Sequence, residues 1–81
     1  MSIQLIEGRF NPNDALDLIA QMVHIKIKYH ESKIINNDNE DDIKSREAKI
    51  KRLQKELFEF GNQLKNKVDG VKINALIQIE Q

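Results

Sequence analysis

Two histidines are the first residues whose type suggests acid–base or metal chemistry. His24 and His30 are six residues apart, which places them about 120° apart around a helix. They cannot bind one metal ion in the way that histidines one helical turn apart do. His24 falls on a polar helix face and His30 beside an apolar stripe, so the pattern favours a solvent-facing and a packed side chain. We therefore expect no catalytic residue, no metal site and no cofactor.

Lys26 and Lys33 are unusual because they fall between two apolar stripes of the same helix and not on its polar face. Their aliphatic stems can cover apolar surface while the ammonium groups reach water, which is the favoured interpretation. With His30 they could instead hold an anion at a subunit seam. An enzyme with a site at a dimer seam, formed by Lys26, Tyr29 and His30, is a further alternative.

A basic stretch gives the best indication of nucleic-acid binding in the chain. Within residues 44–55, Glu47 is the one acid among six cations, Lys44, Arg46, Lys49, Lys51, Arg52 and Lys55. These cations wrap around a helix, and the chain has four aromatic residues and no base-stacking motif. A solvated helix face is the favoured interpretation. The alternative is a small nucleic-acid-binding regulator that uses Lys44, Lys51, Arg52 and Lys55.

Most other chemistry lacks the residues that it needs. The chain has no cysteine, which excludes disulfides and thiolate zinc sites, and its three glycines form no phosphate-binding loop. Thirteen Lys and Arg balance thirteen Asp and Glu, so no net charge draws the chain to nucleic acid or anionic lipid. No signal-peptide pattern or membrane-spanning run is present. We therefore expect a cytoplasmic protein that does not bind membranes.

The elements that position these residues follow from hydrophobic periodicity. Residues 71–80 alternate apolar and polar side chains, which predicts a strand. Residues 2–10 are a weaker strand, because Ile6 breaks the alternation begun by Ile3 and Leu5, and Gly8 suggests a bulge or bend.

A helix over residues 12–35 begins with Asn11 as the N-cap and Pro12 in the first turn. Its apolar residues form two stripes that together cover roughly 200° of its circumference, more than one neighbouring helix can bury. One stripe contains Ala15, Leu18, Met22, Ile25 and Tyr29, and the other contains Leu16, Ile19, Val23, Ile27, His30 and Ile34.

A second helix over residues 42–68 follows a polar loop at residues 36–41. Ile43, Ile50, Leu57 and Leu64 recur every seven residues, as in a coiled coil. We expect Leu53, Leu57, Phe60 and Leu64 to be buried against the first helix, and Gly70 to close the second helix in a left-handed conformation.

The whole chain is expected to form one α+β domain, predominantly helical, in the order β-α-α-β. Helices of similar length favour an antiparallel hairpin, which brings the N- and C-terminal strands to the same end, where they can pair. A lone two-stranded sheet is marginal in water, and a chain of this size has a small core.

These features favour a homodimer that acts as a non-catalytic interaction or scaffold protein, with another protein as a further possible partner. The candidate interface residues are Ala15, Leu18, Met22, Ile25, Tyr29, Phe58, Ile73 and Ile77.

Overall fold

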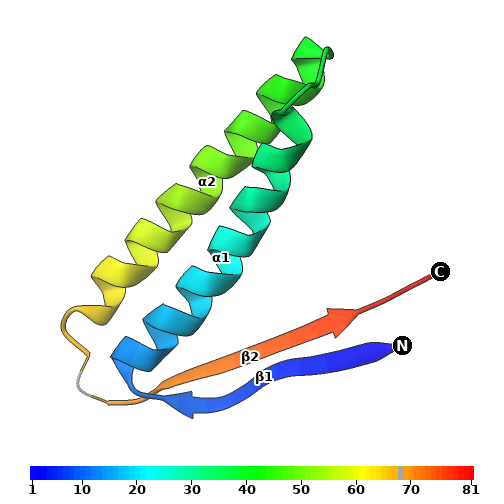
Figure 1. Cartoon of the computed structure of the whole chain (residues 1–81). Coiled ribbons are helices and arrows are strands. Elements are labelled where there is room, and N and C mark those ends of the chain that lie inside the picture. The colour runs from blue at the N-terminus through cyan, green and yellow to red at the C-terminus, as the bar shows by residue number, and fades with distance from the viewer. Residues whose placement is uncertain (68) are drawn as a thin grey trace.

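The computed structural model, which describes residues 1–67 and 69–81, has the predicted order of elements. Strand β1 (Ser2–Phe10) is followed by helix α1 (Pro12–Ile34), helix α2 (Glu40–Leu64) and strand β2 (Val71–Gln78). The helices form an antiparallel hairpin, and the strands pair antiparallel at the end where α1 begins (Figure 1). The α+β fold is therefore confirmed. In the described part of the chain, no helix combines the length and apolarity needed to cross a membrane.

Helix α1 begins where the sequence predicts. Asn11 has extended backbone angles (φ −66°, ψ 159°), and its side-chain oxygen accepts a hydrogen bond of 2.8 Å from the amide of Asp14. Pro12 occupies the first turn, where no amide donor is needed. The helix ends at Ile34, and Asn36 turns the chain with a left-handed φ of 62°, a conformation that Asn adopts more readily than most residues.

Helix α2 differs from the prediction at both ends. It begins two residues earlier, at Glu40, because Asn39 and not a later residue caps it by accepting from the Asp42 amide at 3.1 Å. It ends at Leu64 and not at Val68, a residue that lies outside the described part of the chain. The end of α2 lies beside the start of α1, because the two helices run antiparallel (Figure 1).

Gly70 is not the left-handed cap that the sequence predicted. Its φ is not positive, and α2 has already ended six residues before it. Gly70 lies instead at the strand junction, where its carbonyl accepts a hydrogen bond of 3.0 Å from the Arg9 side chain. A Cβ on Gly70 would be 3.4 Å from the carbonyl oxygen of Phe10, at the near limit of ordinary van der Waals contact, so the approach of the two segments does not require glycine.

The sheet register explains the broken alternation in β1. Ile6 pairs with Ala75 and Gln4 pairs with Leu76, so Leu5 is the extra residue of a β-bulge. The bulge restores Ile3, which pairs with Ile77, to the same face as Ile6. The bulge therefore lies at Leu5 and not at Gly8, where the sequence suggested a bulge or a bend. Gly8 pairs with Ile73 and has a φ of 145°, a conformation that glycine adopts far more easily than other residues.

The core is small. Ala15, Ile27, Leu64 and Ile73 are the buried apolar residues of the described chain, and no large side chain there is completely enclosed. Leu64 is buried as predicted, but Leu53, Leu57 and Phe60 are only half-buried. A seam between two helices covers one side of each side chain, and no third layer covers the rest.

The molecule has the shape of a flat, open V (Figure 1). Its extents are 47 × 33 × 14 Å, and its radius of gyration is 15.4 Å, against about 12 Å for a compact chain of this length. Its accessible surface is 6641 Å², roughly 1,600 Å² more than the scaling relation gives for a compact protein of this mass. The chain thus resembles one layer of a domain, whereas a stable domain needs two.

Candidate interaction surface and cationic groove

An apolar surface opens where the sheet diverges from α1, and we call it the wedge. It comprises the exposed apolar residues of the two diverging arms. Ile3 and Ile77 belong to the sheet face that carries the buried Ile73, and Ile25 and Tyr29 belong to the α1 stripe that begins with the buried Ala15. Figure 1 shows α1 between α2 and the sheet, with the sheet leaving α1 towards the chain termini. The closed end of the V is a packed core, and the open end is the wedge.

Exposure increases along each element towards the open end. On α1, Ala15 is 0% exposed, Leu18 and Met22 are half-buried, and Ile25 is 70% exposed. On β2, Ile73 is 8% exposed and Ile77, on the same face, is 41% exposed. On both α1 and β2, apolar residues therefore continue beyond the part of the element that is buried within the chain.

The predicted interface residues therefore fall into three groups. Ala15 and Ile73 are buried within the chain. A second group keeps accessible surface on the α1 stripe and on the apolar face of β2: Leu18, Met22, Ile25, Tyr29 and Ile77. Phe58 is exposed but lies elsewhere. It is nine residues from Lys49, which places the two side chains about half a turn apart around α2. Phe58 therefore faces away from the side of the hairpin that carries Lys49. No partner is present to test the interface, which stays a prediction.

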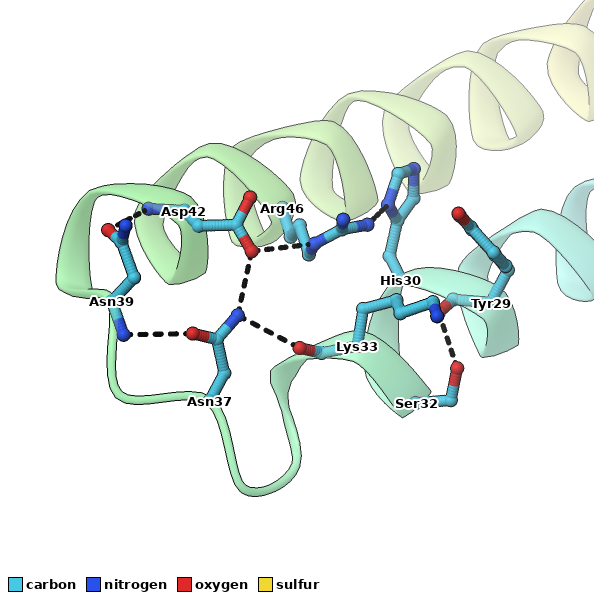
Figure 2. Close-up of polar contacts among 8 residues, drawn as sticks. All are labelled: Tyr29, His30, Ser32, Lys33, Asn37, Asn39, Asp42 and Arg46. Atoms are coloured by element: carbon cyan, nitrogen blue, oxygen red, sulfur yellow. Dashed lines mark hydrogen bonds and ion pairs between the residues drawn. The ribbon is translucent and has the colours of Figure 1, made fainter.

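A polar network closes the other end of the hairpin (Figure 2). The Asn37 side chain donates to the Lys33 carbonyl at 3.0 Å and to the Asp42 carboxylate at 2.7 Å, and its oxygen accepts from the Asn39 amide at 2.8 Å. One asparagine therefore connects the end of α1, the loop and the first turn of α2.

The network continues into the helix seam through Arg46. Its Nε donates to Asp42 at 3.0 Å, and its Nη1 lies 3.1 Å from Nδ1 of His30, as Figure 2 shows. Arginine can only donate, so Nδ1 of His30 is the acceptor and Nε2 carries the proton. The Arg46 and Asn37 hydrogen bonds lower the pKa of Asp42.

His30 is buried between the helices, as the sequence predicted. Desolvation lowers its pKa, and the positive charges of Lys26, Arg46 and Lys49 lower it further, against a smaller opposing effect of Asp42. The imidazole is therefore held neutral. Its Nε2 has no hydrogen-bond partner among the described residues, and no side-chain nitrogen there is both fully buried and unpartnered. Nε2 therefore keeps a small accessible surface, although the residue as a whole is only 3% exposed.

Beside His30, a groove of about 210 Å³ crosses the hairpin, and we call it the cationic groove. It is lined by Lys26, His30, Lys49, Arg52 and Leu53. Cations also surround the neighbouring ring of Tyr29, with the Lys26 nitrogen at 5.0 Å, the Lys33 nitrogen at 5.7 Å and the Arg46 guanidinium at 5.8 Å. This side of the hairpin is strongly positive.

The other side of the hairpin has the opposite character. A groove there is lined by Ile34, Ile35 and Ile50 together with Glu31 and Glu47. On α1, Glu31 is five residues after Lys26, about 140° further around the helix. The two grooves therefore flank the helix seam with charges of opposite sign.

The structure divides the basic residues that the sequence singled out. It brings Lys26, His30 and Arg52 to one groove and places Lys33 beside Tyr29. Lys44, Lys51 and Lys55 do not line that groove, and Lys55 lies 4.0 Å from Glu59 on exposed α2.

Sequence reasoning missed Lys49 as a groove residue and Arg46 as the partner of His30. The available signal was that Arg46 and His30 each interrupt an apolar seam, because two polar residues at seam positions of facing helices are candidates for a buried pair.

In the described part of the chain, no three His, Cys, Asp or Glu side chains are arranged to hold a metal ion. Comparisons of the chain with protein-family models, with curated proteins and with solved structures found no match. Function therefore has to be inferred from the wedge and the grooves.

Proposed function

We propose that this chain is a non-catalytic interaction protein that works as a homodimer, in which a second copy covers the wedge. The observation that carries the proposal is the rise in exposure along α1 and β2 from Ala15 and Ile73 to Ile25 and Ile77. On both elements the apolar pattern continues past the last residue that the chain itself buries. An exposed apolar surface of this kind indicates a site where another molecule binds.

The surface area also supports a protein partner. The excess of roughly 1,600 Å² over a compact chain exceeds the ~800 Å² that each partner contributes to a standard interface. A second copy would supply the missing layer over the two-stranded sheet and would protect its open edges.

A second copy suits this surface better than an unrelated protein of marked charge. The chain has a formal net charge of +0, so two copies do not repel each other over long distances. A twofold axis lets one apolar surface cover an identical one and closes the assembly at two chains. The expected location of such a dimer is the cytoplasm, as the sequence analysis suggests.

Paired substitutions test which surface associates. Ile25 and Ile35 are nearly equally exposed, at 70% and 69%, but Ile25 belongs to the wedge and Ile35 lines the acidic groove. Ile25→Asp should convert the dimer to monomer in light scattering coupled to size exclusion, while Ile35→Asp should leave it dimeric. Equal effects of the two substitutions would refute the wedge as the interface.

A further inference from the structure

We propose that the cationic groove is a binding site for a phosphoryl group. Four nitrogen-bearing side chains converge on it, with Lys26 and His30 from α1 and Lys49 and Arg52 from α2. This site goes beyond the proposed homodimer. All of its lining residues belong to one chain, and it borders the wedge, because the Lys26 nitrogen lies 5.0 Å from the ring of Tyr29.

The positive charge in the groove is poorly neutralised by the protein. Among the described residues, Lys26 and Lys49 have no carboxylate within ion-pair distance, and Arg52 has Glu56 at 3.8 Å with both side chains more than half exposed. Exposed pairs of this kind are weak, so Arg52 can reorient towards a ligand. Arg46 is already bound to Asp42.

His30 supplies a donor that is fixed in direction. Arg46 occupies Nδ1 and so assigns the proton to Nε2, which has no acceptor among the described residues, while the ring is packed between the helices at the wall of the groove. A neutral imidazole N–H held in this way can donate to an anion without its own charge change. The lysines and Arg52 supply the charge, and His30 supplies orientation.

The size and donor set select the class of ligand. A volume of about 210 Å³ is below the roughly 300–1,000 Å³ of pockets for drug-sized molecules. A phosphate group carries about −1.5 to −2 charges and several acceptor oxygens, which matches three cations and one N–H better than a single carboxylate does. The phosphoryl group can be free phosphate or part of a nucleic-acid backbone, and the experiment below separates these two sources.

The test is a titration of the full chain with sodium phosphate at pH 7.5, followed by NMR of the imidazole and backbone resonances at constant ionic strength. We expect saturable shifts of the His30 imidazole and of the Lys26 and Lys49 amides, with His24, exposed on the same helix, as the internal reference. Lys49→Gln should weaken binding roughly tenfold, as expected for loss of a charged hydrogen bond. Lys51→Gln, with the same charge change outside the groove, should not.

A parallel titration with a single-stranded oligonucleotide identifies the source of the group. Tighter binding than free phosphate, with the same loss in Lys49→Gln, assigns the site to a nucleic-acid backbone, and binding of phosphate alone assigns it to a small phosphate. Two results would overturn the proposal: no saturable shift of His30 with either probe, or equal weakening by Lys49→Gln and Lys51→Gln. Both lysines are exposed, so neither substitution should unfold the chain, and circular dichroism of the variants checks this.

Discussion

The two apolar stripes of α1 have different degrees of cover. The stripe that faces α2 contains Ile27, which is buried, and His30, whose polar ring is buried with a hydrogen-bond partner. The stripe that continues into the wedge ends in Ile25 and Tyr29, which are exposed. One stripe of α1 is therefore buried within the chain, and the other is left partly exposed. The intramolecular fold covers only part of the apolar surface of this helix.

The largest expected difference between the two sides is in stability. Leu64→Ala removes a buried side chain from the helix seam and should lower the free energy of unfolding by about 2–5 kcal/mol. Urea unfolding monitored by circular dichroism at several protein concentrations measures this loss, which we expect at every concentration.

Ile25→Ala is the matched change on the wedge side. Ile25 is exposed in the single chain, so truncation should have an effect only at concentrations where a second copy covers it. A concentration-independent loss as large as that of Leu64→Ala would show that Ile25 is packed within the monomer, and would remove the difference between the stripes.

A smaller loss of stability is expected at the helix caps, whose hydrogen bonds are made within the single chain. Asn39→Ala removes the acceptor for the Asp42 amide and should cost about 1 kcal/mol of stability. Asn13→Ala, at an exposed position in the first turn of α1, is the control and should stay within about 0.5 kcal/mol of the parent. Equal losses in thermal or urea unfolding would contradict the assigned cap.

The smallest effect that we predict is a pH dependence from the buried His30. Its pKa is lowered in the folded chain by burial and by Lys26 from α1 and Arg46 and Lys49 from α2, with Asp42 opposing. As the pH falls below about 6.5, the ordinary pKa of histidine, the unfolded chain takes up a proton before the folded chain does, so stability decreases.

Unfolding measured between pH 7.5 and 5 checks this decrease. The lowered pKa of Asp42 acts in the same direction, but only in more acidic solution. His30→Gln should flatten the profile and His24→Gln should not. An unchanged slope in His30→Gln would assign the pH dependence to other groups.

Local sequence signals predicted most of the fold. Asn11 and Pro12 set the start of α1, and the change from helical to alternating periodicity located β2. The end of α2 could not be predicted in this way, because it depends on tertiary packing, which places the end of α2 beside the start of α1 (Figure 1). The bulge at Leu5 likewise depends on pairing with β2, although the broken alternation at Ile6 was its visible trace.

The site was predictable only in part. The apolar stripe of α1 identified Ile25 and Tyr29, but which half of the stripe stays exposed depends on how the sheet diverges (Figure 1). The cationic groove joins Lys26 to Lys49, residues on different helices, and their proximity follows from the hairpin register. Arg46 looked like an interruption of the seam, whereas its role is to bind His30 across it.

Sedimentation equilibrium of the unmodified chain at micromolar concentration tests the central claim most directly. The proposed homodimer predicts a species with twice the 9.4 kDa mass of the chain, which dissociates on dilution with a corresponding loss of stability. A monomer that stays soluble and unfolds cooperatively at these concentrations, with the wedge open to solvent, would contradict it.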